Sequence, residues 1–279
     1  MKRIRGGSGL GDAIYVRPIV EHFIRAGEAV TVCSNYPDVF QDTGAKVLPF
    51  DRYNIDVLAH YTVGKRNPST TQWDDICASA RVTVPLNFDW TVKNRKLLDE
   101  LRALAAGRPL ILVSGGRVPM ARHDGFGLEL LPDRRAFYAV LEALHGCFTV
   151  QIGNAEQIYP LTTDANLSGK TSVADLFDLA SSCDGLVGQC SFIIPLAEVF
   201  DKPLLVVWSA SGLSTARHVY ISSITPGKIL SKPSSRFVID EWPAEKLQED
   251  ARAFGDICRG GGAVQEQERG DSRECTFGT

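Results

Sequence analysis

The chain has 279 residues, of which 44% are hydrophobic and 23% charged, and its formal net charge is −3. This composition is ordinary for a soluble globular protein, and the length allows two modest domains or one large one. The slightly negative balance excludes a global basic field for nucleic acid, and the longest apolar run, Leu204 to Trp208, is far too short to span a membrane.

The first half of the chain alternates short apolar runs with amphipathic stretches. A short strand over 2–5 leads into a glycine loop, and a helix is predicted over 11–26. The pattern then predicts a strand at 29–33, a short helix near 37–43, a strand at 45–48, an irregular segment over 51–75, a strand at 81–85 and a helix at 92–105. Gly107-Arg108-Pro109 ends that helix sharply, which is typical of a link between domains.

The second half repeats this alternation. It predicts strand 110–114, a glycine-rich basic loop over 115–127, helix 133–145, strand 147–152, helix 173–183, strand 185–187, helix 194–200 and strand 204–208. A last amphipathic helix is expected over 243–258. Residues 259–279 hold too few apolar side chains to pack, so they are expected to be disordered.

The alternation of strands and helices predicts an α/β fold with parallel sheets. Because the two halves are similar, we expect two Rossmann-like domains facing across a cleft. The predicted divisions are an N-terminal domain at 1–107, a C-terminal domain at 108–242, the helix at 243–258 and the tail at 259–279.

The glycine loop at the start, Gly6 to Gly11, ends at Asp12. Glycines allow a ligand to approach the backbone closely, and the amides at a helix start favour negative charge. Asp12 is therefore a candidate general base, with Gly9 and Gly11 in a loop that a ligand can approach closely. The alternative is that Asp12 only caps the helix. Because Asp12 stands where a dinucleotide fingerprint starting at Gly7 needs its last glycine, the loop does not predict an NAD site.

A second candidate site is the loop that follows the buried strand 110–114. Ser114, Gly115, Gly116, Arg117 and Arg122 combine backbone freedom with positive charge, as a phosphate or pyrophosphate site does. The alternative is a solvated loop whose arginines bind nothing.

Two further loops are donor-site candidates. Near Lys170 and Thr171, Ser172 and Asp175 predict a helix start with a capping box, and Lys170 is a candidate phosphate contact. After strand 185–187, Gln189 and Ser191 belong to a loop whose amides form an anion seat. One turn further on, Glu198 is placed to bond a ribose hydroxyl, the alternative being a solvated helix residue.

The seven cysteines and five histidines show no metal-ligand spacing, so no metal is predicted. An odd number of scattered cysteines is typical of reduced thiols in the cytoplasm. Glycines follow the basic residues Lys2 to Arg5 where a signal peptide needs an apolar run, which also favours a cytoplasmic location.

Three segments in this order resemble the ADP-heptose:lipopolysaccharide heptosyltransferases. Leu10-Gly11-Asp12, with Pro18 six residues later, resembles that family's opening. Leu167 to Ser172 with Leu176 is similar to its L-x-G-K-T-S-x-x-x-L segment, and residues 181–203 are similar to its donor-site strand, loop and helix. The resemblance covers residues 4–26 and 109–210.

The resemblance implies a GT-B fold with the acceptor on the first domain and the nucleotide-sugar on the second. It implies inverting transfer without a metal or other cofactor, with Asp12 as the base that takes the acceptor's hydroxyl proton. The implied partners are a nucleotide-diphosphate sugar and a glycan or lipid-linked glycan, whereas nucleic acid is not expected.

The sequence departs from the family in its donor loop. Cys190, Phe192 and Pro195 replace the usual Asp, Gly and His, which leaves the nucleotide and the sugar open. Two alternatives remain, namely a nucleotide-binding or interaction module of this fold without catalysis, and a GT-B enzyme of another kind, such as a nucleotide-sugar epimerase or a DNA-base glycosyltransferase. For a DNA acceptor, the basic helix at 92–105 is the one candidate surface.

Overall fold

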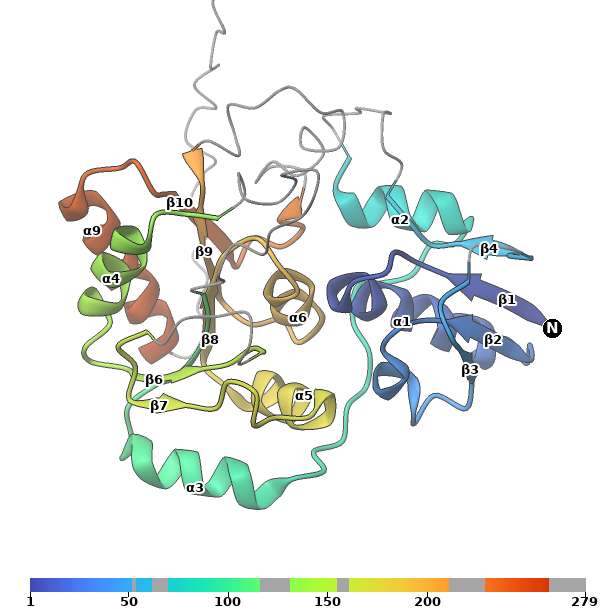
Figure 1. The fold of residues 1–279 in the computed structure, drawn as a ribbon, viewed down its shortest axis with the longest axis horizontal. Coiled ribbons are helices and arrows are strands. Elements are labelled where there is room, and N and C mark those ends of the chain that lie inside the picture. The colour runs from blue at the N-terminus through green and yellow to red at the C-terminus, as the bar shows by residue number, and fades with distance from the viewer. Residues whose placement is uncertain (52–53, 62–69, 116–130, 155–160, 211–228, 261–279) are drawn as a thin grey trace, which may run out of the picture.

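Two separate parallel sheets organise the molecule. A computed structural model describes residues 1–51, 54–61, 70–115, 131–154, 161–210 and 229–260 (Figure 1). Every strand pair in both sheets is parallel. The predicted α/β class is therefore confirmed, with two sheets whose helices meet between them. Among the described helices, none combines the length and apolar character that a membrane crossing needs.

The first sheet has the strand order β3-β2-β1-β4. Its strands are β1 (Lys2–Arg5), β2 (Val30–Cys33), β3 (Lys46–Leu48) and β4 (Val57–Leu58). The chain leaves β1 toward β2 and β3 on one side and later returns to β4 on the other. The carboxyl ends of β1 and β4 therefore lie next to each other at a point where the strand order reverses. The helices of this half are α1 (Leu10–Arg25), the 3₁₀ helix η1 (Pro37–Phe40) and α2 (Gln72–Ala80).

The second sheet has the order β10-β9-β8-β5-β6-β7. Its strands are β5 (Leu110–Ser114), β6 (Phe148–Gln151), β7 (Ala165–Asn166), β8 (Gly185–Gly188), β9 (Leu204–Trp208) and β10 (Ser235–Ile239). Because β6 and β8 lie on opposite sides of β5, the strand order reverses between β5 and β8. Open parallel sheets bind ligands at such a point, outside the carboxyl ends of the strands.

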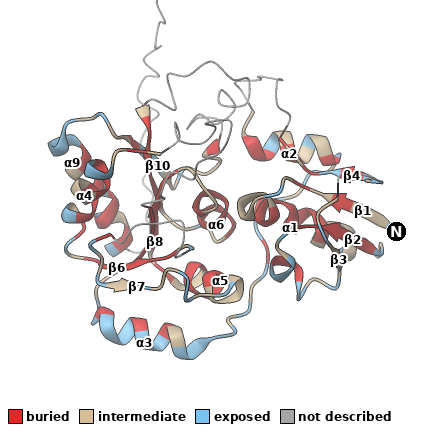
Figure 2. Cartoon of the chain, in the orientation of Figure 1, coloured by how far each residue is buried: buried red, intermediate tan, exposed pale blue. Residues whose placement is uncertain are grey.

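Helices cover both faces of this second sheet (Figure 1). One face carries α4 (Arg134–Ala143) and α9 (Ala244–Arg259), and the other carries α5 (Val173–Ser182) and α6 (Ile193–Val199). Alternate residues of β5 pack on opposite faces, Leu110 and Leu112 in one core cluster and Ile111 and Val113 in the other. All residues of α6 are buried, because this helix lies between the second sheet and α1 (Figure 2).

Most predicted elements are confirmed within one to three residues at their ends, but the segment between residues 51 and 94 differs. The predicted strand at 81–85 is wrong, since Arg81 ends α2 in the left-handed conformation (φ 57°). The region predicted to be irregular contains β4 and the start of α2, where Thr71 and Asp74 cap the helix reciprocally. Strands β7 and β10 were not predicted either.

The helix predicted at 92–105 is α3 (Arg95–Ala105), and it packs against α5 of the second sheet. The sequence analysis assigned this helix to the N-terminal domain. By its contacts it lies with the second half, so the chain crosses between the halves before α3. The predicted domain boundaries themselves stay a prediction, and the predicted disordered tail falls outside the described residues from residue 261 onward.

Candidate functional site

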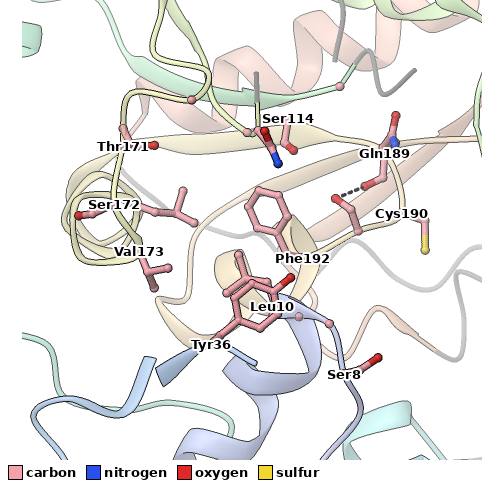
Figure 3. Close-up of a pocket in the computed structure, with 18 residues that line it drawn as sticks. Ser8, Leu10, Tyr36, Ser114, Thr171, Ser172, Val173, Gln189, Cys190 and Phe192 are labelled. Carbon is pink, nitrogen blue, oxygen red and sulfur yellow. Dashed lines mark hydrogen bonds between the residues drawn. The ribbon is translucent and has the colours of Figure 1, made fainter. Parts of the chain in front are cut away.

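A cavity of about 740 Å³ lies between the two halves of the molecule (Figure 3). The carboxyl ends of strands β1, β5, β6 and β8 open onto it, and so do the amino ends of helices α1, α5 and α6. The first half contributes Ser8, Gly9, Leu10, Gly11 and Tyr36. The second half contributes Ser114, Gly115, Gly153, Asn154, Gly169, Thr171, Ser172, Val173, Leu176, Gln189, Cys190, Ser191 and Phe192.

The loops after β5 and β8 form the part of the cavity at the reversal of strand order. The backbone amide of Gln189 donates to the Ser114 carbonyl oxygen at 3.1 Å, which holds the two loops together. A methyl group on Gly115 would come within 2.4 Å of the Phe137 ring, so only glycine allows the end of β5 to lie this close to α4. Ser114 and Gln189 are 7% and 5% exposed, so both present a polar group from an otherwise buried position.

The first turn of α1 has backbone amides without a side-chain cap. Its N-cap residue, Gly9, has no side chain, and among the described residues no side chain accepts from the amides of Leu10 and Gly11. At α5, by contrast, Ser172 and Asp175 form the predicted capping box, with donor–acceptor distances of 3.0 and 3.1 Å. The amides and dipoles of helix starts favour negatively charged oxygen atoms in the cavity.

Asp12 is the third residue of α1, and its carboxylate turns back toward the glycine loop. It accepts a hydrogen bond from the Gly9 amide at 3.0 Å. A methyl group on Gly7 would come within 2.4 Å of the Asp12 carboxyl, so glycine is needed for this close approach. Burial raises the pKa of Asp12, opposed by the Gly9 hydrogen bond and the charge of His60.

The hydrogen bond that Asp12 accepts from the Gly9 amide agrees with the capping interpretation, and the role of Asp12 as a base stays a prediction. Its neighbours Gly9, Leu10 and Gly11 line the cavity, whereas Asp12 itself does not. Asp12 is partly exposed and thus adjoins the cavity wall without being part of it.

His60 is a neighbour of this site that was not predicted from the sequence. His60 follows β4, which pairs with β1, so the two strands end together and His60 comes close enough to lower the pKa of Asp12. The ring is fixed by a 2.6 Å contact between Nδ1 and the Tyr61 carbonyl oxygen. Hydrophobic alternation could not locate His60, because β4 has only two residues and shows no period.

Most of the predicted site residues that the structure describes do line the cavity. These are Ser114, Gly115, Thr171, Gln189, Ser191, Gly9 and Gly11. Lys170 is exposed and outside the lining, and its Nζ donates to the Asn166 carbonyl oxygen at 3.0 Å. Gly116, Arg117 and Arg122 lie outside the described residues.

Glu198 is placed differently from the prediction. It is 1% exposed and absent from the cavity lining, so neither a ribose contact nor a solvated position fits this geometry. Its Oε1 accepts from the amides of Ser231 and Lys232 at 2.6 and 3.3 Å, which fixes the chain before β10. Burial raises the pKa of Glu198 to about 7. The side chain is buried because α6 is covered on all sides, which its short sequence does not reveal.

Other side chains give a similar picture of ordinary packing outside the cavity. In the described part of the chain, no three His, Cys, Asp or Glu side chains gather as a metal site would require. On the basic helix α3, two cations form ion pairs, Arg102 with Asp184 at 2.6 Å and Lys96 with Glu100 at 3.8 Å. This arrangement is that of a solvated, ion-paired helix face.

Comparisons with known proteins were made at the level of sequence and of structure. No protein-family model and no curated protein sequence matches the chain. Among solved structures, it is similar to ADP-heptose lps heptosyltransferase II of E. coli, with a TM-score of 0.61 and 12% identity over 91% of this chain and 98% of the other.

Two other solved structures are similar to the chain. One is a glycosyl transferase of family 9 from Veillonella parvula, with a TM-score of 0.60 and 12% identity over 92% of this chain and 97% of the other. The other is a putative UDP-N-acetylglucosamine 2-epimerase from Listeria monocytogenes, with a TM-score of 0.50 and 12% identity over 93% and 90%. At such low identity the similarity establishes the fold alone, and the chain has the GT-B-like fold that these heptosyltransferases and glycosyltransferases share.

Proposed function

We propose that this protein is a glycosyltransferase that moves a sugar from a nucleotide-diphosphate donor to a hydroxyl group of an acceptor. The observation that carries the proposal is the cavity itself. Three helix starts and the ends of four parallel strands converge on it, in a fold otherwise found in heptosyltransferases. Its volume of about 740 Å³ is that of a cofactor-sized ligand site.

The second half supplies the groups that suit a nucleotide-diphosphate. Ser114, Thr171 and Ser191 bring hydroxyl groups, Gln189 brings a side-chain amide, and the loops around them bring backbone amides. Such donors, fixed before the reaction, stabilise the negative charge that develops on a departing diphosphate. Lys170 is one residue from the lining. Among the described residues its Nζ donates to one backbone oxygen, that of Asn166, and this hydrogen bond can be exchanged for one to a phosphate oxygen.

The first half supplies the candidate base. In an inverting transfer, the acceptor oxygen attacks the anomeric carbon from the face opposite the diphosphate, so the base and the diphosphate site belong on opposite walls. Asp12 adjoins the first-half wall, and the proposed diphosphate site is on the second-half wall. For the proton transfer, the carboxylate exchanges its hydrogen bond with Gly9 for one with the acceptor hydroxyl.

The remaining parts of the proposal come from the sequence itself and from its resemblance to heptosyltransferases. We propose that the transfer inverts the sugar, needs no metal or other cofactor and takes place in the cytoplasm, with Arg117 and Arg122 adding charge near the diphosphate. The acceptor proposed from the resemblance is a glycan or a lipid-linked glycan.

A thermal-shift screen tests the donor site. ADP, UDP, GDP and CMP are titrated with their common sugar conjugates, ADP first because the E. coli relative is named for ADP-heptose. At one hundred times its Kd, a ligand that binds only the folded state adds about 2.7 kcal/mol of stability. We expect one nucleotide-diphosphate to give a selective shift. A flat response to the whole series at saturating concentration would overturn the proposal.

A matched pair of variants locates the binding. Ser191→Ala removes a hydroxyl that lines the cavity, and we expect it to weaken nucleotide binding. Ser181→Ala removes a hydroxyl whose contacts among the described residues stay within α5, with the Asp178 carbonyl oxygen and the Ser182 hydroxyl, and it serves as control. An equal loss in both variants would point to stability rather than to the site.

A second candidate function is a nucleotide-binding module without catalysis. It is favoured by the Asp12 carboxylate, which bonds to the glycine loop and does not line the cavity. Nucleotide binding without turnover, over a series of acceptors, would support this module. Nucleotide release from a donor in the absence of any acceptor would indicate instead a hydrolysing enzyme of the same fold, such as an epimerase.

A further inference from the structure

The two walls of the cavity differ in chemistry. The second-half wall is polar, with Ser114, Thr171 and Gln189 among its donors and acceptors. The first-half wall is made largely of Leu10 and Tyr36, and Phe192 faces the cavity from the start of α6. Figure 3 shows the Phe192 ring lying in the cavity between the Leu10–Tyr36 pair and the edge formed by Ser114 and Gln189. We call Leu10, Tyr36 and Phe192 the apolar shelf.

The backbone holds the shelf in place. Phe192 approaches α1 so closely that a methyl group on Gly11 would lie 3.3 Å from the Phe192 Cα. Leu10 is the first residue of α1, and Tyr36 directly precedes η1. All three side chains are half-buried and pack against the main core cluster, so each has one side fixed and another bordering the cavity.

The charge of the cavity limits what the shelf can bind. None of the described lining residues carries a formal charge. A phosphate or carboxylate placed against Leu10 and Phe192 would lose its hydration with no cation in return from the described lining residues, which is costly. An apolar ring would instead exchange water for contact with two aromatic faces and an aliphatic side chain, which is favourable.

We propose that the apolar shelf is the acceptor subsite and that the acceptor is an uncharged alcohol carrying an aromatic ring. This inference rests on the proposed transfer and deepens it by naming the acceptor's chemistry, which differs from the glycan acceptor that the resemblance implies. Two of the three shelf residues belong to the first half, which also carries the candidate base Asp12, so an acceptor on the shelf lies on the same side of the cavity as that base.

The transfer is balanced without any further reactant. The acceptor oxygen forms a bond to the anomeric carbon while the bond from that carbon to the diphosphate oxygen breaks. The nucleotide-diphosphate leaves with the electron pair, and the hydroxyl proton passes to Asp12. The product is a glycoside of the ring-bearing alcohol.

The test uses 2-naphthalenemethanol as probe, with methyl glucoside and glucose 6-phosphate as matched hydroxyl compounds that lack the aromatic ring. Saturation-transfer NMR on the full chain reports which protons touch the protein, first alone and then with saturating nucleotide. We expect transfer to the naphthalene protons that persists with the nucleotide bound. Tighter binding of either sugar compound would overturn the proposal.

Variants assign the probe to the shelf. Phe192→Ser and Tyr36→Ser should raise the Kd of the probe by about tenfold while the nucleotide Kd changes by less than about threefold. Phe237→Ser is the control, because that ring is 38% exposed on β10 and outside the cavity. If Phe192→Ser does not fold, Phe192→Leu and Tyr36→Phe replace the serine variants, and a smaller but measurable loss is expected for Phe192→Leu.

The outcomes separate this inference from the proposed function. If the nucleotide displaces the probe and Phe192→Ser weakens both equally, the ring is a platform for the nucleobase and the acceptor subsite is wrong. If the nucleotide binds and the probe does not, the inference fails alone. If no nucleotide binds at all, the proposed function fails, whatever the probe does.

Discussion

The carboxylate of Asp12 has one structural bond and one proposed chemical role, and the two are separable. An asparagine at this position keeps an oxygen that accepts from the Gly9 amide but cannot take a proton. We expect Asp12→Asn to lower turnover by about 10²- to 10⁴-fold, as the loss of a general base does. Its melting temperature should stay near that of the parent, because the hydrogen bond is retained.

The comparison with Asp12→Ala completes this test. Alanine removes the hydrogen bond as well, and loss of a helix cap costs about 1 kcal/mol. Denaturant unfolding and steady-state kinetics of both variants check the assignment. Turnover within a few-fold of the parent in Asp12→Asn would show that Asp12 is only a cap.

Glu198 gives a prediction about pH. Its pKa rises from 4.5 to about 7 in the folded protein because the side chain is buried. The folded state thus holds this proton more tightly than the unfolded state. The resulting stability is complete below pH 4.5 and is lost as the pH rises to about 7, a difference of about 3 kcal/mol.

Glu198→Gln removes this loss. The glutamine oxygen keeps an acceptor for Ser231 and Lys232, and no proton is released. The free energy of unfolding should therefore fall less between pH 4.5 and 7 than in the parent. Urea unfolding at several pH values measures it, and the variant-minus-parent difference removes the contributions of Asp12 and Glu21, whose pKa values are also raised by burial. Parallel curves for the two proteins would contradict the prediction.

At the scale of elements, the segment that crosses between the halves is held by one carboxylate. Asp178 on α5 is fully buried and accepts from Trp90 Nε1 at 2.7 Å and from the amides of Lys93 and Asn94 at 3.0 and 2.6 Å. Toward the first half, the ring centre of Phe88 in the crossing segment lies 4.3 Å from the buried Arg17 guanidinium of α1. The crossing is therefore fixed to both halves.

Asp178→Ala should destabilise the protein by at least about 3 kcal/mol, since three donors lose a charged acceptor in a buried place. Ser172→Ala on the same helix is the matched control, because it removes the hydroxyl of the capping box and leaves the Asp175–Asn94 hydrogen bond in place; it should cost only about 1 kcal/mol. Chemical denaturation of the two variants compares them. Equal losses would mean that the crossing segment is held by its apolar packing alone.

The elements also show which parts of the fold the sequence could predict. Strands β5, β6, β8 and β9 were predicted well because they are buried on both faces and form short apolar runs, as Leu204–Trp208 does. Strand β4 has two residues, and α2 ends on a left-handed arginine instead of a glycine, so neither gives a local signal.

The same contrast holds for the candidate site. Ser114 and Gln189 were found because a polar residue after a buried strand marks the carboxyl edge of a parallel sheet. The burial of Glu198 and the closeness of His60 to Asp12 depend on which elements become neighbours in space. No local pattern encodes these contacts.

At the scale of the whole molecule, the candidate base and the diphosphate site of the proposed reaction lie on opposite walls of the cavity. The reaction relies on backbone amides instead of a metal ion. Helix starts and polar side chains would carry the charge of the leaving diphosphate. We therefore expect turnover in excess EDTA to stay within about twofold of turnover with added Mg²⁺. Loss of activity with the chelator, restored by a divalent cation, would show that the charge is carried by a metal.

The contact between Gly11 and α6 has a consequence for the distance between reactants. A methyl group on Gly11 would meet the Phe192 Cα at 3.3 Å and Pro195 Cγ at 3.4 Å, so a side chain there acts as a spacer between the halves. Misplacement by about 1 Å costs as much as a hundredfold in rate. Gly11→Ala should therefore lower kcat while the nucleotide, held by the second-half wall, keeps its affinity. The distance between the attacking hydroxyl oxygen, on the side of Asp12, and the anomeric carbon, on the side of α6, then depends on the absence of a single methyl group.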